Sequence, residues 1–247
     1  MIRGLVVATL ALGLSACAES QNVLPATTLS ATESAQPTKA VGYLDAWADN
    51  DVRAMRRQSA PGSPARDFAG YWGGTLAAGR VDTDSPSVVA STDMATIRYS
   101  DGTEYYFRDF AFDRRDRLEA WTSDPGGPLA ARIVGGPPVN GQLGPIVVRV
   151  RYQYRNTDDD LRITAAVINE SGRAVEVGAR GYVSPGGSRA KAAIGSEART
   201  GIVTVPAASS RPVVIAVPDS RPGGRLSLFA YRGDGTRVGN AVMQLPQ

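Results

Sequence analysis

The 247-residue sequence contains no histidine and only one cysteine, Cys17. The absence of histidine removes the commonest general base, the Ser-His and Cys-His nucleophile pairs and the usual zinc sites. Catalysis would have to depend on Asp, Glu, Tyr, Arg or Lys, so the composition argues against a hydrolase of a common type. With a single cysteine the chain forms no intramolecular disulfide, and its folded parts depend on their hydrophobic cores.

The sequence also lacks a large excess of positive or negative charge. The net charge is +3, from 27 basic and 24 acidic residues. No clustered basic block is present, so we expect no nucleic-acid partner. The sequence has no phosphate-binding loop, nucleophile elbow or dinucleotide fingerprint, and we expect no cofactor. Asp158, Asp159 and Asp160 are typical of a solvated turn rather than a metal site, because three consecutive residues cannot all face one ion.

The N-terminus has the pattern of a secretory signal. Arg3 precedes an apolar stretch, residues 5–14, that is too short for a membrane-spanning helix. Residues 14–17, Leu-Ser-Ala-Cys, then resemble the lipobox of bacterial lipoproteins. This resemblance implies cleavage before Cys17, attachment of acyl chains such as palmitate to it, and an anchor on the extracytoplasmic face of the cell membrane. The alternative is an ordinary secretory signal with an incidental cysteine.

Composition divides the chain into five segments. Residues 1–16 are predicted to be the signal peptide, and residues 17–37 the lipidated cysteine with a flexible tether rich in Ser, Thr, Ala and Gln. Residues 38–133 and 146–247 are predicted to be two folded domains. The Gly- and Pro-rich residues 134–145 between them are predicted to be a linker.

The first domain begins with helical periodicity and continues with strand periodicity. Asp51 and Ser63 are predicted to cap two short helices. Helices followed by an antiparallel sheet indicate an α+β unit of two packed layers. The first helix is predicted from an apolar stripe at helical spacing that consists of Ala40, Tyr43, Leu44 and Trp47. A strand is predicted over residues 104–113, with Tyr105, Phe107 and Asp109 on one face and Tyr106, Phe110 and Phe112 on the other.

Three short segments of this domain carry a family resemblance. Residues 43–51 (YLDAWADND), 105–110 (YYFRDF) and 118–121 (LEAW) resemble the nuclear transport factor 2-like superfamily, above all its extracytoplasmic members in actinobacterial lipoproteins and at the N-termini of penicillin-binding proteins. The resemblance implies an α+β cone, in which helices pack on a curved antiparallel sheet around a cavity. Some members are isomerases or epoxide hydrolases that use Asp, Tyr and Arg, and many only bind or scaffold.

The second domain is predicted to be an all-β sandwich, because about seven strand patterns are separated by regular turn signals. Its first strand alternates apolar residues with polar ones. Residues 164–171 (TAAVINES) and 222–228 (PGGRLSL) resemble the immunoglobulin-like, telokin-type modules of Gram-positive surface lipoproteins. The inward-facing residues of the first strand are predicted to be Ile146, Val148, Val150, Tyr152 and Tyr154.

Most of the aromatic residues lie between Tyr43 and Trp121. In a fold with a cavity, some of them would line an apolar pocket and offer hydroxyl groups to a ligand. The alternative is that they fill the core of a small domain. The candidate pocket residues are Tyr43, Trp47, Tyr71, Trp72, Tyr99, Tyr105, Phe107, Asp109 and Trp121.

The favoured function is non-enzymatic: binding or scaffolding in the cell envelope, with the membrane reached through the lipid anchor. The partner would be another envelope protein or an apolar small molecule. One alternative is a proton-transfer or epoxide-opening enzyme in the N-terminal cavity, with Asp109 as base and Tyr99 or Tyr105 as hydrogen-bond donor. That alternative requires Asp109 to point into the cavity. In a third interpretation, the sandwich only spaces the first domain from the cell wall.

Overall fold

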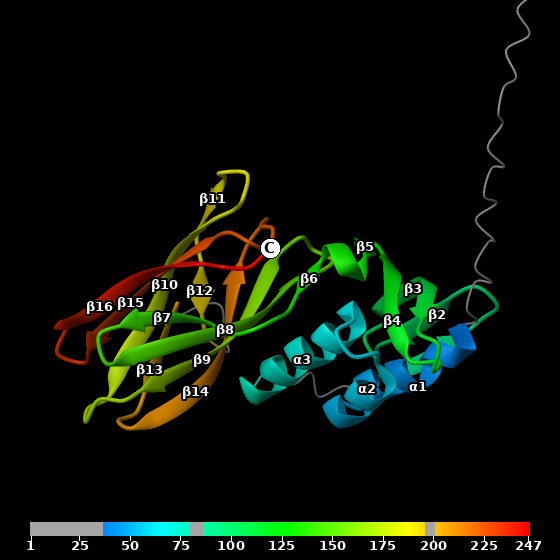
Figure 1. Ribbon diagram of the computed structural model, residues 1–247, viewed down its shortest axis with the longest axis horizontal. Helices are drawn as coiled ribbons and strands as arrows, with labels where there is room; N and C mark the ends of the chain where they lie inside the picture. Colours follow the sequence, from blue (N-terminus) through cyan, green and yellow to red (C-terminus); the bar gives the residue numbers. More distant parts are fainter. Residues whose placement is uncertain (1–36, 80–85, 196–200) are drawn as a thin grey trace, which may run out of the picture. The chain divides into compact units, whose positions relative to one another are not determined.

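The computed structural model describes residues 37–79, 86–195 and 201–247 (Figure 1). Cys17, the predicted signal peptide and the predicted tether up to residue 36 lie outside the described residues. The described part of the chain belongs to one compact unit. In it, three helices precede antiparallel sheets, which agrees with an α+β layout followed by a β-sandwich layout.

Local capping sets where the second and third helices begin. The Asp51 carboxylate accepts a hydrogen bond from the Ala54 amide at 2.8 Å, and the Ser63 hydroxyl accepts one from the Arg66 amide at 3.2 Å. Both predicted caps are therefore confirmed. The helices are α1 (Pro37–Ala48), α2 (Val52–Gln58) and α3 (Pro64–Ala77).

The first sheet has the strand order β1-β2-β3-β4-β5. Helix α1 contacts β1, β2 and β3, while α3 contacts β4. The buried stripe of α1 therefore packs on the sheet together with aromatic side chains of α3. The strands are β1 (Ser87–Ala90), β2 (Ala95–Arg98), β3 (Glu104–Phe112), β4 (Leu118–Asp124) and β5 (Gly127–Pro128).

A β-bulge in β3 changes the predicted alternation of its side chains between the two faces of the sheet. Asp109 has a φ of +52°, and the pairing of β3 with β4 shifts register there. One extra residue sends every later side chain to the opposite face. Phe107 and Phe110 are consequently both buried, while Tyr106 and Asp109 are exposed. The prediction that Phe107 and Asp109 share a face opposite Phe110 is wrong for this reason.

Two antiparallel sheets that share one hydrophobic core follow. One has the order β11-β10-β15-β16, with β13 also paired to β10; the other has the order β12-β14-β9-β8-β6, with β7 also paired to β8. The first comprises β10 (Val175–Val183), β11 (Arg189–Ala190), β13 (Ile202–Val205), β15 (Arg225–Arg232) and β16 (Arg237–Gln244). The second comprises β6 (Ile133–Val134), β7 (Val139–Leu143), β8 (Ile146–Arg155), β9 (Leu161–Asn169), β12 (Ala193–Ile194) and β14 (Ser209–Val217).

The segment predicted to be a linker, residues 134–145, contains β7 and the end of β6. Both strands pair with β8. The glycine content of this segment reflects close packing: a Cβ added at Gly141 would lie 2.5 Å from the Met243 sulfur. Leu143 is fully buried in the core of the two sheets. The middle of this segment, residues 139–143, is thus a strand of the sheet and not a free connection.

A second β-bulge lets the two halves of β8 pack against different hydrophobic cores. Its pairing with β9 shifts register between Val150 and Tyr152. Before the shift, side chains enter the core of the two sheets; after it, Tyr152 and Tyr154 pack on the cluster of the helices and the first sheet. The predicted inward position of these two tyrosines is therefore wrong. Gln153 points inward instead, where it donates to the Pro246 carbonyl and accepts from the Gly223 amide.

Helix α3 lies directly against β8 and β9 because two of its residues lack side chains. A Cβ at Gly70 would lie 2.3 Å from the Tyr152 ring, and one at Gly74 would lie 2.9 Å from the Thr164 Cβ. Such distances leave no room for alanine without movement of the neighbours. The approach places the end of β8 beside the helices.

Candidate functional site

A cleft of about 530 Å³ lies where α1, α3, the first sheet and the β8–β9 turn meet. We call it the aromatic cleft, because eight aromatic side chains face it. These are Trp47, Phe68, Tyr71, Trp72, Tyr99, Tyr105, Phe107 and Tyr154. Its other lining residues are Thr75, Gly79, Ser123, Asn156, Thr157, Asp158 and Arg162.

The aromatic walls are held by mutual packing. The centre of the Trp47 ring lies 4.8 Å from the ring centre of Phe68, 5.7 Å from that of Trp72 and 5.6 Å from that of Phe107. Each pair has an edge-to-face orientation. Edge-to-face pairs are favoured by the ring quadrupoles. The Trp72 indole also donates a hydrogen bond of 3.1 Å to the Asn50 side chain. The walls are consequently ordered before a ligand arrives.

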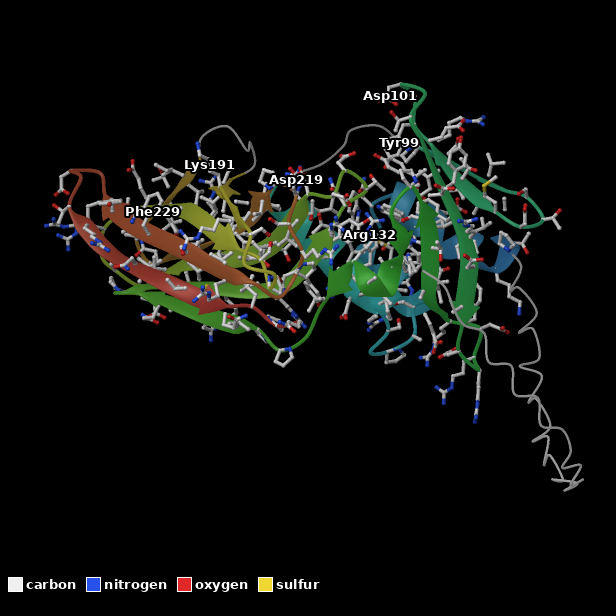
Figure 2. All side chains as sticks on the ribbon, turned by 90° about the horizontal axis from the view of Figure 1, so that it is seen from above. Tyr99, Asp101, Arg132, Lys191, Asp219 and Phe229 are labelled. Carbon is white, nitrogen blue, oxygen red and sulfur yellow. The ribbon has the colours of Figure 1, made fainter. Side chains whose placement is uncertain are left out.

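The structure brings most of the candidate pocket residues together. Tyr99 comes from the end of β2, near the turn that contains Asp101 (Figure 2), and the other residues come from α1, α3 and β3. The two alternatives, a pocket lining and a filled core, therefore both apply: the aromatic residues form part of a core, and one side of that core is open. The candidates that line the cleft are Trp47, Tyr71, Trp72, Tyr99, Tyr105 and Phe107.

Three candidates lie elsewhere. Tyr43 and Trp121 are buried beneath the cleft, and the Tyr43 hydroxyl donates to the Ala65 carbonyl at 2.7 Å. Burial raises the pKa of Tyr43 well above its ordinary value. The Asp109 side chain is 69% exposed and its nearest ion-pair partner is Arg108, at 3.8 Å. Asp109 lies outside the cleft because of the β3 bulge, so it is not positioned as a base for a ligand bound there.

A polar cluster that the sequence did not predict borders the cleft. It consists of Arg132, Ser123 and Tyr154, and only the last two line the cleft itself. Arg132 follows the short helix η1 (Leu129–Ala131) and is 4% exposed. Its guanidinium donates to the Ser123 hydroxyl at 2.5 Å and to the Tyr154 hydroxyl at 3.2 Å, and its Nε donates to the Arg155 carbonyl at 2.7 Å.

The environment of Tyr154 keeps its hydroxyl protonated. Burial raises the pKa of Tyr154 to about 12, and the nearby Arg132 charge only partly opposes this rise. The Arg132 guanidinium also lies 5.1 Å from the centre of the Tyr154 ring, within range of a cation–π contact. The only hint of this position in the sequence is the change from valines to large tyrosines at the end of the strand.

The charged side chains at the β8–β9 end of the cleft have opposite signs. Arg162 forms an ion pair with Asp160 at 2.9 Å, while Asp158 is exposed. The Asp160 amide is held by the Asn156 side chain at 2.8 Å, which fixes the turn. This end of the cleft therefore combines one paired cation with one solvated carboxylate.

Within residues 37–79, 86–195 and 201–247, no group of three or more acidic or cysteine side chains is placed to hold a metal ion. No helix in these ranges has the length and apolar character needed to cross a membrane. In comparisons with known proteins, no family, curated protein or solved structure matches the chain.

Proposed function

We propose that this protein is a lipid-anchored binding protein of the cell envelope and that the aromatic cleft binds an apolar small molecule. The observation that carries the proposal is the ordered aromatic wall around a volume of about 530 Å³. Small-molecule sites usually measure about 300–1,000 Å³ and combine apolar walls with a few polar groups. The aromatic cleft combines aromatic walls with polar groups from tyrosine hydroxyls and from the β8–β9 end.

The sequence resemblances support the same proposal. Three helices beside a five-stranded antiparallel sheet agree with a nuclear transport factor 2-like domain over residues 38–133. Two sheets around one core agree with an immunoglobulin-like domain over residues 146–247. The lipobox-like residues 14–17 support an extracytoplasmic anchor at Cys17. Both domain assignments and the location belong to the proposal.

The exposed surface favours a small molecule over a protein partner. In the described residues, few large hydrophobic side chains are exposed: Val89 and Tyr106 flank Thr96 on one face of the first sheet, and the other two come from separate strands. So few exposed apolar residues are normal on monomeric proteins, whereas a protein interface needs a larger contiguous patch. These residues are Val89, Tyr106, Ile202 and Val242.

Binding can be tested with N-phenyl-1-naphthylamine, an uncharged apolar fluorophore. Trp47 and Trp72 line the cleft, so we expect energy transfer from tryptophan to the bound fluorophore. Replacing Tyr105 with alanine removes a wall residue and should raise the Kd about tenfold, the loss expected for one buried aromatic contact. The matched control is Tyr106→Ala, since Tyr106 neighbours Tyr105 but is exposed and does not line the cleft.

The control should bind as the unchanged protein does. Equal weakening by both substitutions, or no binding to the unchanged protein, would contradict the assignment of the cleft. Circular dichroism of each variant will show whether the fold is retained.

A further inference from the structure

We propose that the natural ligand of the aromatic cleft carries an anionic oxygen group, which Tyr154 binds through its hydroxyl and Arg132 attracts through its charge. This inference rests on the proposed function and specifies the chemical class of the ligand: an apolar body with one anionic head. Tyr154 would contact the ligand, and Arg132 would act from behind it.

The first observation is that Arg132 is a buried cation without a carboxylate partner. Within the described residues, its hydrogen-bond acceptors are a serine hydroxyl, a tyrosine hydroxyl and a backbone carbonyl, all of them neutral. None of the ion pairs formed in the described part of the chain includes Arg132. Burying a charge is costly unless an opposite charge compensates it. An anion in the adjoining cleft would supply that compensation.

The second observation concerns which hydroxyl of the cluster can donate a hydrogen bond to a ligand in the cleft. Ser123 and Tyr154 both line the cleft, and both hydroxyl oxygens accept hydrogen bonds from Arg132. The Ser123 hydroxyl donates to the Gly127 carbonyl at 3.3 Å, so its proton already has an acceptor. A tyrosine hydroxyl accepts one hydrogen bond and donates another. The Tyr154 oxygen faces Arg132, which leaves its O–H as the donor for a ligand.

The third observation is that the surroundings favour a charged acceptor over a neutral one. A hydrogen bond to an anion is roughly twice as strong as a neutral one, and a chain of bonds that starts at a cation polarises each member. Arg132 is itself almost fully buried, which reduces the screening of its charge by water. Among the described residues, the charged groups that line the cleft are Arg162 and Asp158, which have opposite signs, and Arg162 is already paired.

The test compares two probes with the same body. N-phenyl-1-naphthylamine is uncharged, and 1-anilinonaphthalene-8-sulfonate adds one sulfonate to the same ring system. The unchanged protein should bind the sulfonate about tenfold more tightly, as expected for one hydrogen bond to a charged group. Displacement of the neutral probe by the sulfonate will show that both occupy the cleft.

Tyr154→Phe removes the hydroxyl and keeps the aromatic ring. We expect it to reduce the tenfold preference to about twofold, with little change for the neutral probe. Tyr182→Phe is the matched control, because Tyr182 is a buried tyrosine of β10 whose hydroxyl bonds the Arg221 carbonyl and the Gly224 amide, away from the cleft. This control should keep the full preference. Arg132→Met should also abolish the preference where circular dichroism shows a folded protein.

The outcomes separate the two proposals. If the neutral probe fails to bind, the proposed function fails and this inference fails with it. If both probes bind equally, the cleft is a binding site but the anionic class is wrong. If the sulfonate is preferred and Tyr154→Phe keeps that preference, the Tyr154 hydroxyl does not bind the anionic group and the inference is wrong. Loss of the preference in Tyr154→Phe but not in Tyr182→Phe supports the inference.

Discussion

At the scale of single residues, the position of Arg132 depends on its hydrogen bonds and on the lack of a side chain at Gly126. Gly126 has a φ of +126°, which side chains other than that of glycine rarely allow. A Cβ at this position would lie 2.1 Å from the Arg132 Nη1 atom. The guanidinium thus occupies space that exists only because residue 126 has no side chain.

Gly126→Ala is therefore expected to displace Arg132 and to strain the backbone. The free energy of unfolding should fall by about 1–3 kcal/mol, the usual cost of overpacking or of an unfavourable backbone conformation. Urea denaturation would measure the change. Gly127→Ala is the control for backbone strain alone, because Gly127 also has a positive φ, of +79°, but its added Cβ would contact nothing within 4 Å. Equal losses in both variants would show that contact with Arg132 contributes nothing.

At the scale of elements, helix α3 joins the first core to the sheet that contains β8 and β9. Gly70 and Gly74 permit the approach, and their positions four residues apart place them on one face of the helix. An alanine at either site would meet a rigid neighbour, the Tyr152 ring or the Thr164 side chain. The helix would then have to move away from the sheet.

Gly70→Ala is expected to destabilise the protein even though alanine favours helix more than glycine does. The gain in helix propensity is about 1 kcal/mol, and the overpacking cost is about 1–3 kcal/mol. The net loss should appear as a lower urea midpoint. Gly172→Ala serves as the control, because a Cβ there would contact nothing within 4 Å. A midpoint for Gly70→Ala at or above that of Gly172→Ala would contradict the close packing of α3.

The elements that can be predicted well from the sequence are those determined by interactions between residues close together in the chain. Asp51 and Ser63 cap their helices through bonds to residues three positions away. The strand predicted over residues 104–113 has nearly the same bounds in the structure, where β3 spans Glu104–Phe112. The bulges at Asp109 and before Tyr152 follow from pairing with other strands, so no local pattern reveals them.

The candidate site shows the same division. The aromatic wall could be anticipated because most of its residues belong to one region of the sequence. The polar cluster could not, since Ser123, Arg132 and Tyr154 come from separate elements and meet only through tertiary packing. Asp109 had suggestive aromatic neighbours in the sequence, but one inserted residue turned it to solvent.

At the scale of the whole molecule, the lipobox-like residues 14–17 place the proposed anchor in the chain before the first described residue. Cys17 lies 20 residues before Pro37, the first described residue. Stable anchoring generally takes two acyl chains, each buried CH₂ contributing about 0.8 kcal/mol. The anchor and the cleft should therefore be separable by a substitution at Cys17.

Cys17→Ser removes the thiol that would carry the lipid and retains the apolar stretch, residues 5–14, of the predicted signal peptide. We expect the variant to lose stable membrane attachment and to be either secreted or kept as an uncleaved precursor. Labelling of cells with a radioactive fatty acid, followed by fractionation, measures both effects. Purified Cys17→Ser protein should bind N-phenyl-1-naphthylamine with an unchanged Kd, because all the described residues that line the cleft follow Pro37. Equal labelling and equal membrane retention of the variant would disprove the lipid anchor, whereas a changed Kd would mean that the N-terminal segment contributes to the cleft.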